Sequence, residues 1–563
     1  MKKKFNIFLV SVMALGASLS SCSDSYMEDL NTDESKANVI DPNAQLTTAL
    51  LQSYGDFSQM EVYRSYVYAF TQQFMGTWNA AFYGGALNPD NDQMRRMWDS
   101  FYTMAVKNLV DGIHSTQSDD MLCVNAALRI QRVYIMSLLT DTYGDIPCTE
   151  AGLGFIEGIA TPRYDKQEDI YNFFFTELAA CVEQLKKGTD RLTGDVTGYA
   201  GDTSKWIKLA NSLRMRFAMR ISGVAPEKAK QEFEAAVNAE GGYISSSADD
   251  AYVNYMDVTF NFGQDGSNDY RGNALSKICF GQDPTGPTFI CTTFYNTLRD
   301  TADPRLHRLC RFYYDVLRSQ TSLEGRVDLT DEILAKAAAG EVTIAPCEPG
   351  AAWWNAWPAG FYSETVAALK EQYPGNGDIN PTLDKESRPK LANNFLHSNN
   401  PGIIMTYAEV ELLLAEAAVN GWNVNGDADE HYEKGVYAAM QLLVERYGCE
   451  PFAAGEIDEY IYNNGLGATE ASAKNAINTQ AWILHLTNPS ECWANLRRSG
   501  YPRLLNRDNY TVYEYTIIDG PETPVRLKYP QLESKYNSVN YEEAIGRMGG
   551  TDNWHSHVWW DKE

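Results

Sequence analysis

The chain has 563 residues and a formal charge of −27 at pH 7, because 74 acidic residues stand against 47 basic ones. A negative field of this size repels phosphate backbones, so the charge argues against nucleic acid as a partner. Hydrophobic residues make up 44% of the sequence, which is enough for a large buried core in a chain of this length.

The N-terminus is typical of an exported protein. Lys2, Lys3 and Lys4 form a positive start. The apolar run that follows, 5–19, is shorter than the roughly 20 residues that a membrane-spanning helix needs. We therefore predict a signal peptide over 1–21 that is removed after export.

The next feature is "LSSC", residues 19–22, which resembles a lipobox. In a lipobox the cysteine, here Cys22, becomes the lipid-bearing N-terminus of the mature protein. Each buried methylene of the lipid contributes about 0.8 kcal/mol, so the lipid would anchor the chain on a membrane without crossing it. An ordinary signal peptide followed by a chance cysteine is the alternative.

The stretch 22–40 is acidic and polar and has no apolar pattern, so we predict a flexible tether. Acidic residues directly after a lipidated cysteine also resemble an export signal of outer-membrane lipoproteins. We therefore expect a lipid-anchored protein of the outer membrane that faces the extracellular side.

Three segments of the first half repeat apolar residues at the spacing of one helix face, and they are 123–144, 167–188 and 202–222. Gly188 is expected to end the second helix. The start of the third helix is expected to be capped by Asp202 or one of the two residues after it.

The third helix also carries a repeat signature. Together with 226–237 it matches helix A and helix B of a tetratricopeptide unit, at Trp206, Leu209, Ala210, Leu213, Ala229, Phe233 and Ala236. A second copy covers 406–421 and 427–440, with Ala428, Tyr432 and Gly435 at the same spacing as in helix B of the first copy. Because such units pack only against their neighbours, more than two are expected, and 95–140 and 473–500 are the candidates.

The section between the two copies, 241–402, is different. It is rich in Gly, Ser, Asn, Asp and Tyr, which is typical of loops and short strands. A long irregular segment flanked by regular helices usually carries function, so we expect a functional role for it.

Six blocks of the sequence resemble the recurring blocks of the SusD/RagB family. They begin with "DTYGDIPCTEA" and end with "TDNWHSHVWWDK", and they cover 141–151, 161–185, 406–418, 493–504, 524–545 and 551–562. Each block alone is a soft motif, whereas six in the family's order behind a lipoprotein signal are specific. The resemblance implies a mostly α fold of about four tetratricopeptide-like units with an irregular, loop-rich ligand-binding subdomain.

The implied domain organisation is a single domain over 41–563. Its helical-repeat half lies mainly in 41–240 and 403–508, its ligand-binding half mainly in 241–402, and an aromatic-rich tail in 509–563.

Members of this family are nutrient-binding lipoproteins on the outer surface of Gram-negative bacteria. The resemblance therefore implies a lid on a TonB-dependent transporter of the SusC type, which delivers oligosaccharides, or peptides in some members. It implies neither enzyme activity nor a cofactor. Two other classes remain open. A periplasmic tetratricopeptide scaffold lipoprotein leaves the loop-rich half unexplained, and a lipoprotein glycosidase leaves the repeats unexplained.

A sugar site needs flat rings for the C–H faces of the sugar and polar groups for its hydroxyls. One segment with this mixture is 76–98, whose candidate platforms and hydroxyl partners are Trp78, Tyr83, Asn79, Asp92 and Arg95. The glycines at 84 and 85 argue against a helix here, so we predict a shaped loop.

The other segment is "AAWWNAWPAGFY", residues 351–362. Trp353, Trp354 and Trp357 cannot all fall on one strand face or one helix stripe, so we expect at least one of them to be an exposed platform. For any single ring, a place in the core is the alternative, because tryptophan is highly buried on average.

The remaining polar motifs are interpreted as structural. Glu409 and Glu416 share one helix face and are expected to pair with Arg497 or Arg498. A catalytic carboxylate pair is the alternative, since glycosidase carboxylates have no fixed short spacing.

No metal or phosphate site is predicted. His555 and His557 have the spacing of metal ligands on a strand but lack a third ligand nearby, so surface histidines are favoured. The segment 88–93 resembles the start of a calcium loop but lacks the required Gly and Glu. A structural calcium ion is thus the one cofactor left open.

Overall fold

The computed structural model describes residues 40–75, 80–258, 269–280, 288–315, 323, 326–348, 364–372, 387–505, 519–520 and 522–561. The predicted signal peptide and the lipid-bearing Cys22 lie outside these residues, so both remain predictions. The unit described below runs from Pro42 to Glu563.

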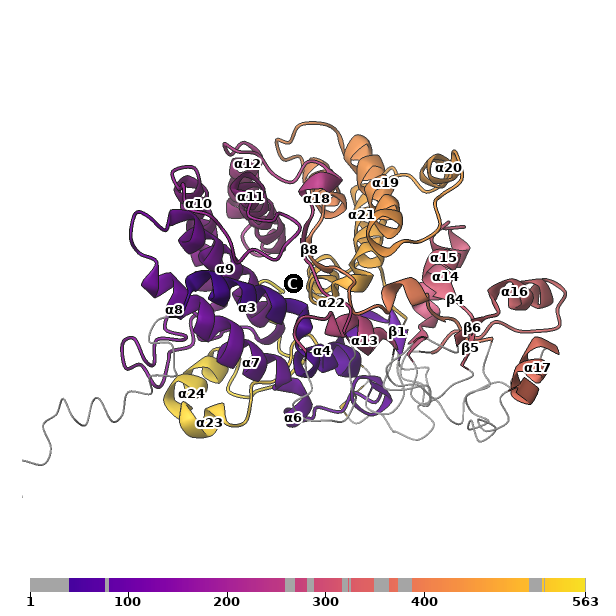
Figure 1. The fold of residues 1–563 in the computed structure, drawn as a ribbon, viewed down its shortest axis with the longest axis horizontal. Helices are drawn as coiled ribbons and strands as arrows, with labels where there is room; N and C mark the ends of the chain where they lie inside the picture. Colours follow the sequence, from indigo (N-terminus) through magenta and orange to yellow (C-terminus); the bar gives the residue numbers. More distant parts are fainter. Residues whose placement is uncertain are drawn as a thin grey trace, which may run out of the picture. The chain divides into compact units, whose positions relative to one another are not determined.

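Long helices that follow one another along the chain pack side by side in the first half of this unit (Figure 1). They are α8 (Lys107–Ser115), α9 (Leu122–Tyr143), α10 (Gln167–Leu185), α11 (Thr203–Arg220) and α12 (Pro226–Val237). All three helices predicted from periodicity are therefore present. The Asp202 carboxylate accepts a hydrogen bond of 2.9 Å from the Ser204 N–H and caps α11 as predicted.

The apolar positions of the repeat signature form the buried faces of these helices. Trp206, Ala210 and Phe233 are fully buried. The Phe233 ring packs against Trp422 of the second copy, with 5.2 Å between the ring centroids. Among the described helices, only α9 is long and apolar enough to cross a bilayer, and 83% of that apolar stretch is buried inside the protein, as in a core helix.

A second helical block consists of α18 (Tyr407–Val419), α19 (Ala428–Tyr447), α21 (Glu470–Leu484) and α22 (Pro489–Ser499). A Cβ added to Gly435 would lie 2.9 Å from Leu412 Cδ2. The small residue of the signature is therefore what lets α19 approach α18. The two segments proposed as further units, 95–140 and 473–500, also contain packed helix pairs, α8 with α9 and α21 with α22.

Shorter helices connect and flank these blocks. Before α8 they are α3 (Pro42–Gly55), α4 (Phe57–Val62), η1 (Tyr63–Val67), α5 (Tyr68–Thr71), η2 (Ala81–Gly85), α6 (Asn91–Met94), α7 (Arg96–Ser100) and η3 (Phe101–Val106). After α12 they are η4 (Ser247–Asp249), α13 (Ala274–Phe280), α14 (Thr292–Asp300), α15 (Leu306–Leu309), α16 (Thr330–Ala338), α17 (Glu364–Gln372), η7 (Asn393–Phe395), α20 (Glu456–Asn463), η8 (His485–Thr487), α23 (Glu533–Tyr536) and α24 (Ser538–Arg547).

Within the described residues the strands are short and pair two by two, always antiparallel. The pairs are β1 (Phe74–Met75) with β3 (Phe289–Ile290), β2 (Ala251–Val253) with β8 (Gly402–Met405), β4 (Cys310–Arg311) with β7 (Lys390–Leu391), and β5 (Tyr313–Asp315) with β6 (Arg326–Asp328). Most of them lie in 241–402, where loops and short strands were predicted. The mostly α fold with tetratricopeptide-like repeats is confirmed.

Candidate functional site

Three of the eight predicted ligand-binding residues can be placed. Tyr83, Asp92 and Arg95 belong to the described structure, whereas the other five lie outside the described residues and remain predictions, namely Trp78, Asn79, Trp353, Trp354 and Trp357.

The prediction of a loop around the two glycines was wrong, because Ala81–Gly85 forms the π-helical turn η2. A Cβ on Gly84 would lie 2.5 Å from the Ser65 carbonyl oxygen and 2.9 Å from Ala69 Cβ. The lack of a side chain at Gly84 therefore lets η2 pack closely on η1, and Gly84 does not interrupt a helix. This approach holds Tyr83 at the edge of the core.

Only part of the Tyr83 ring is exposed for stacking against a ligand. Its ring lies 5.1 Å from the ring of Phe82 and 5.9 Å from that of Tyr66, measured between centroids. Burial, followed by the nearby Asp90, raises the pKa of the Tyr83 hydroxyl. One part of the ring therefore supports the core, and the rest remains accessible.

Asp92 and Arg95 lie one helical turn apart and bind each other. The Asp90 carboxylate caps α6 by accepting a 2.9 Å hydrogen bond from the Gln93 N–H. Arg95 Nε donates to Asp92 Oδ1 at 3.1 Å, and the same guanidinium also pairs with Asp99. The Asp92 side chain is 81% exposed, so this carboxylate still has room to accept hydrogen bonds from a ligand.

The two segments predicted to carry the tryptophan platforms begin at neighbouring points of the described structure. The segment with Trp78 begins after Met75, and the segment with Trp353 begins after Glu348. Met75 and Cys347 belong to one small apolar cluster, whose other members are Ala69, Phe289 and Cys291. The β1–β3 ladder and an isolated parallel β-bridge, rather than a disulfide, between the backbones at Cys291 and Cys347 hold this cluster together. No local sequence pattern indicated this juxtaposition.

Glu409 and Glu416 belong to buried ion pairs. Glu416 accepts from Arg498 Nη1 at 2.6 Å, as predicted. The pairing predicted for Glu409 was wrong, because its carboxylate binds Arg216 at 2.6 Å. Arg497 instead donates to the backbone carbonyls of Val525 and Asp141.

These contacts argue against a catalytic carboxylate pair. Burial alone would raise the pKa of Glu409, but Arg216 and His485 lower it to about 2, whereas a general acid needs a raised pKa. The cavity beside Glu409 and Glu416 has a volume of about 10 Å³, which is room for about one water molecule and not for a sugar ring.

The ion pairs extend into a network that joins both helical blocks. Arg220 Nη2 donates to Glu491 at 2.6 Å, and Arg220 Nε lies 3.5 Å from Asp141. Asp141 also accepts from the Tyr171 hydroxyl at 2.5 Å and from Trp560 Nε1 at 2.9 Å. This network ties α9, α10, α11 and α22 to the C-terminal tail. The signal that could have revealed it is Arg216 and Arg220, two arginines one helical turn apart among the apolar residues at the end of α11.

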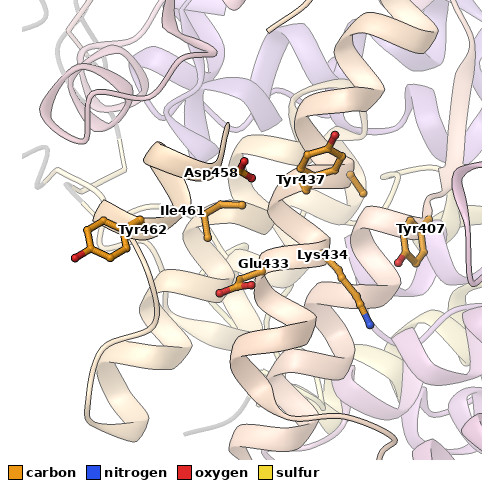
Figure 2. Close-up of a pocket in the computed structure, with 8 residues that line it drawn as sticks. Tyr407, Glu433, Lys434, Tyr437, Asp458, Ile461 and Tyr462 are labelled. Atoms are coloured by element: carbon orange, nitrogen blue, oxygen red, sulfur yellow. The ribbon is translucent and has the colours of Figure 1, made fainter. Parts of the chain in front are cut away.

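Two cavities of the described structure are large enough for a sugar. One, of about 580 Å³, lies between the start of α10 and the C-terminal tail. Some of its charged groups are paired: Asp145 with Arg547 at 2.5 Å, and His557 with the nearby Asp561 at 3.1 Å. The other, of about 480 Å³, lies between α19 and α20 and is lined by three tyrosines (Figure 2). No group of three or more His, Cys, Asp or Glu among the described residues is arranged to hold a metal ion.

Comparison with known proteins identifies the family. A SusD-like family model, described as starch-binding and associating with the outer membrane, matches residues 35–325 and 368–530. No curated protein matches the chain.

Solved structures share the fold over nearly the whole chain. A SusD-like protein from Bacteroidetes is 43% identical, with a TM-score of 0.85 over 93% of this chain and 100% of the other. A chitin-binding protein is 31% identical, with a TM-score of 0.73 and the same coverage. A chitin-binding SusD homologue from Flavobacterium johnsoniae, 22% identical with a TM-score of 0.69 over 93% of this chain and 98% of its own, shares the fold. The chain therefore belongs to the SusD-like family of outer-membrane-associated nutrient- and glycan-binding proteins, whose members are binding proteins rather than enzymes.

Proposed function

We propose that this chain is a lipoprotein, anchored through Cys22 on the outer face of the outer membrane, that binds an oligosaccharide and passes it to a SusC-type TonB-dependent transporter. It acts as the lid of that transporter, with the loop-rich half facing the space between lid and barrel. The lipobox, the acidic tether and the family membership support this role. Energy for transport comes from the partner.

The proposed binding site is supported by one observation, which is that the two tryptophan segments begin at neighbouring points of the described structure. Because Met75 and Cys347 pack in one cluster, residues that follow each of them in the sequence start from neighbouring points. Contact of aromatic rings from both segments with a single ligand is part of the proposal. Tyr83 and the exposed carboxylate of Asp92 lie on the chain that continues from the first segment.

The first ligand to test is an oligosaccharide of N-acetylglucosamine, because the relative at 31% identity is a chitin-binding protein. Binding of a neutral sugar also agrees with the charge of −27, which disfavours anionic ligands.

Calorimetric titration of the full chain with chitohexaose, and with hexasaccharides of glucose, xylose and mannose, tests the site. We expect at least one of the variants W78A, W353A, W354A and W357A to lose about fivefold or more in affinity, since stacking on a ring contributes roughly 1 kcal/mol. The matched control is Tyr536→Ala, which removes a ring that is 66% exposed on α23, outside both segments. Unchanged affinity in all four variants would refute the site.

Protease treatment of intact cells tests the location. A lid on the cell surface is cleaved, whereas a periplasmic scaffold is shielded by the outer membrane. Replacement of Cys22 by Ser should release the chain from the membrane fraction, and copurification of a large outer-membrane protein with the wild-type chain tests the transporter partnership.

A further inference from the structure

A cavity on the second helical block is lined mainly by side chains outside the buried ion-pair network, and of its lining residues only Tyr407 and Ile461 are named as packing against the core. Its volume is about 480 Å³, within the range of ligand pockets. Glu433, Lys434 and Tyr437 line it from α19, and Asp458, Ile461 and Tyr462 line it from α20. Figure 2 shows Tyr462 and Tyr407 at opposite ends of the row of labelled side chains, with Glu433 and Lys434 between them.

The local fold explains why these side chains face outward. Ile457 and Tyr460 of α20 point into a small apolar core with Tyr432 and Val436 of α19. Asp458 and Tyr462 therefore lie on the remaining faces of the same short helix, whereas Ile461 packs partly against that core. The two helices are held at a fixed separation by their buried sides, which keeps the groove between them open.

Two tyrosine rings in the groove are open to solvent. Tyr462 is 88% exposed and Tyr437 is 48% exposed. Neither hydroxyl makes a hydrogen bond within the described part of the chain. Large apolar rings usually bury at least one face, so two exposed rings that line the same cavity form an unusual surface. They offer flat faces for the C–H groups of a ligand.

Two carboxylates beside the rings also lack a polar partner among the described residues. Glu433 and Asp458 make no ion pair or hydrogen bond with any described residue, whereas Lys434 is paired with Glu430 at 2.6 Å. In the 580 Å³ cavity, by contrast, Asp145 and Arg547 neutralise each other. A carboxylate without a partner accepts hydrogen bonds from vicinal hydroxyls at two oxygens.

We propose that this groove is a second binding site for neutral pyranose rings, separate from the predicted tryptophan site. Rings that stack on Tyr437 and Tyr462 would present their hydroxyls to Glu433 and Asp458. The two carboxylates repel uronic acids and sulfated sugars, so the ligand class is uncharged glycans. This inference rests on the proposed function and extends it, because two contacts on one polymer retain it more strongly than either alone.

Calorimetric titration with chitohexaose and the three other hexasaccharides also tests the groove. We expect two sites on the wild-type chain and one on Y437A/Y462A, with the affinity of the remaining site unchanged. The isosteric pair E433Q/D458N should weaken the groove site about fivefold for each carboxylate that binds the sugar, since a charged hydrogen bond exceeds a neutral one by roughly 1 kcal/mol. Tyr536→Ala is the control, and all four replaced side chains lie at the surface, so melting curves should match the wild type.

The outcomes separate this inference from the proposed function. If Y437A/Y462A binds like the wild type while a tryptophan variant loses affinity, the groove is not a sugar site and the proposed function stands. If the groove variants bind sugar normally but no longer copurify with the transporter, the groove is a protein-docking surface and the inference fails. If no hexasaccharide binds the wild-type chain, both proposals fail together.

Discussion

Arg216 and Glu409 form a two-point ion pair between the two helical blocks. Arg216 Nε lies 2.6 Å from Glu409 Oε1 and Nη2 lies 2.7 Å from Oε2, and the two side chains are only 3% and 4% exposed. The pair joins α11 of the first repeat copy to α18 of the second, which are 193 positions apart at these residues. It therefore fixes how the two helical blocks meet.

Replacement of Glu409 by Gln should destabilise the protein by roughly 3–5 kcal/mol, because it leaves the buried Arg216 charge with only the more distant Glu491, at 3.5 Å. Urea unfolding of the variant measures the loss. The double variant R216M/E409M should regain part of the stability, since it removes both charges. Glu470→Gln, which breaks a surface pair with Lys474, is the control and should unfold like the wild type. An E409Q variant as stable as the control would contradict a stabilising role for the pair.

The carboxyl group of Asp250 should make stability depend on pH. It accepts a 2.8 Å hydrogen bond from the Tyr407 N–H and its side chain is 2% exposed. Burial raises its pKa from 3.8 to about 7, although Tyr407 and Arg446 oppose the shift. Between these two values the folded state holds a proton that the unfolded state releases. The contribution of this group to stability is therefore complete below pH 3.8 and is lost as the pH rises to about 7.

Asp250→Asn isolates this effect, because asparagine does not titrate. The difference in unfolding free energy, wild type minus D250N, should fall by up to about 1.4 kcal/mol per pH unit between pH 4 and 7 and be flat above pH 8. Urea unfolding of both proteins across this range measures it. A difference that does not change with pH would mean that the folded carboxyl titrates normally.

Gly84→Ala should disturb the turn that carries Tyr83. The new Cβ would meet the Ser65 carbonyl oxygen at 2.5 Å, so η2 must move away from η1, at a cost of roughly 1–3 kcal/mol. Thermal unfolding gives the stability, and titration with the best hexasaccharide gives the effect on affinity. Gly223→Ala is the matched control, because nothing lies within 4 Å of its added Cβ. Equal stability of the two variants would show that η2 adapts without strain.

The helices could be predicted from the sequence because their signals are local. Periodicity and a capping side chain such as Asp202 act within a few residues of where they stand. The tetratricopeptide signature likewise identified Gly435, whose smallness is needed against the adjacent α18. Each of these features depends on contacts within one helix or between two helices that follow one another in the sequence.

The partner of Glu409 and the shape of the first site segment could not be predicted, because both depend on tertiary contacts. Glu409 binds Arg216 on α11, in the other helical block, and not Arg497 or Arg498 on α22. The role of Gly84 is decided by the carbonyl of Ser65 on a neighbouring turn, so local reasoning treated it as a helix breaker. The tyrosine groove was missed for the same reason, since Tyr437 and Tyr462 carry no motif.

The central claim is that this chain captures a glycan and leaves it intact. Equilibrium dialysis of the purified full chain against the chitohexaose, gluco-, xylo- and mannohexaose panel, followed by an assay for new reducing ends, tests it most directly. We predict saturable retention of at least one hexasaccharide with no new reducing ends. New reducing ends in proportion to protein and time, or no retention of any member of the panel, would contradict the account.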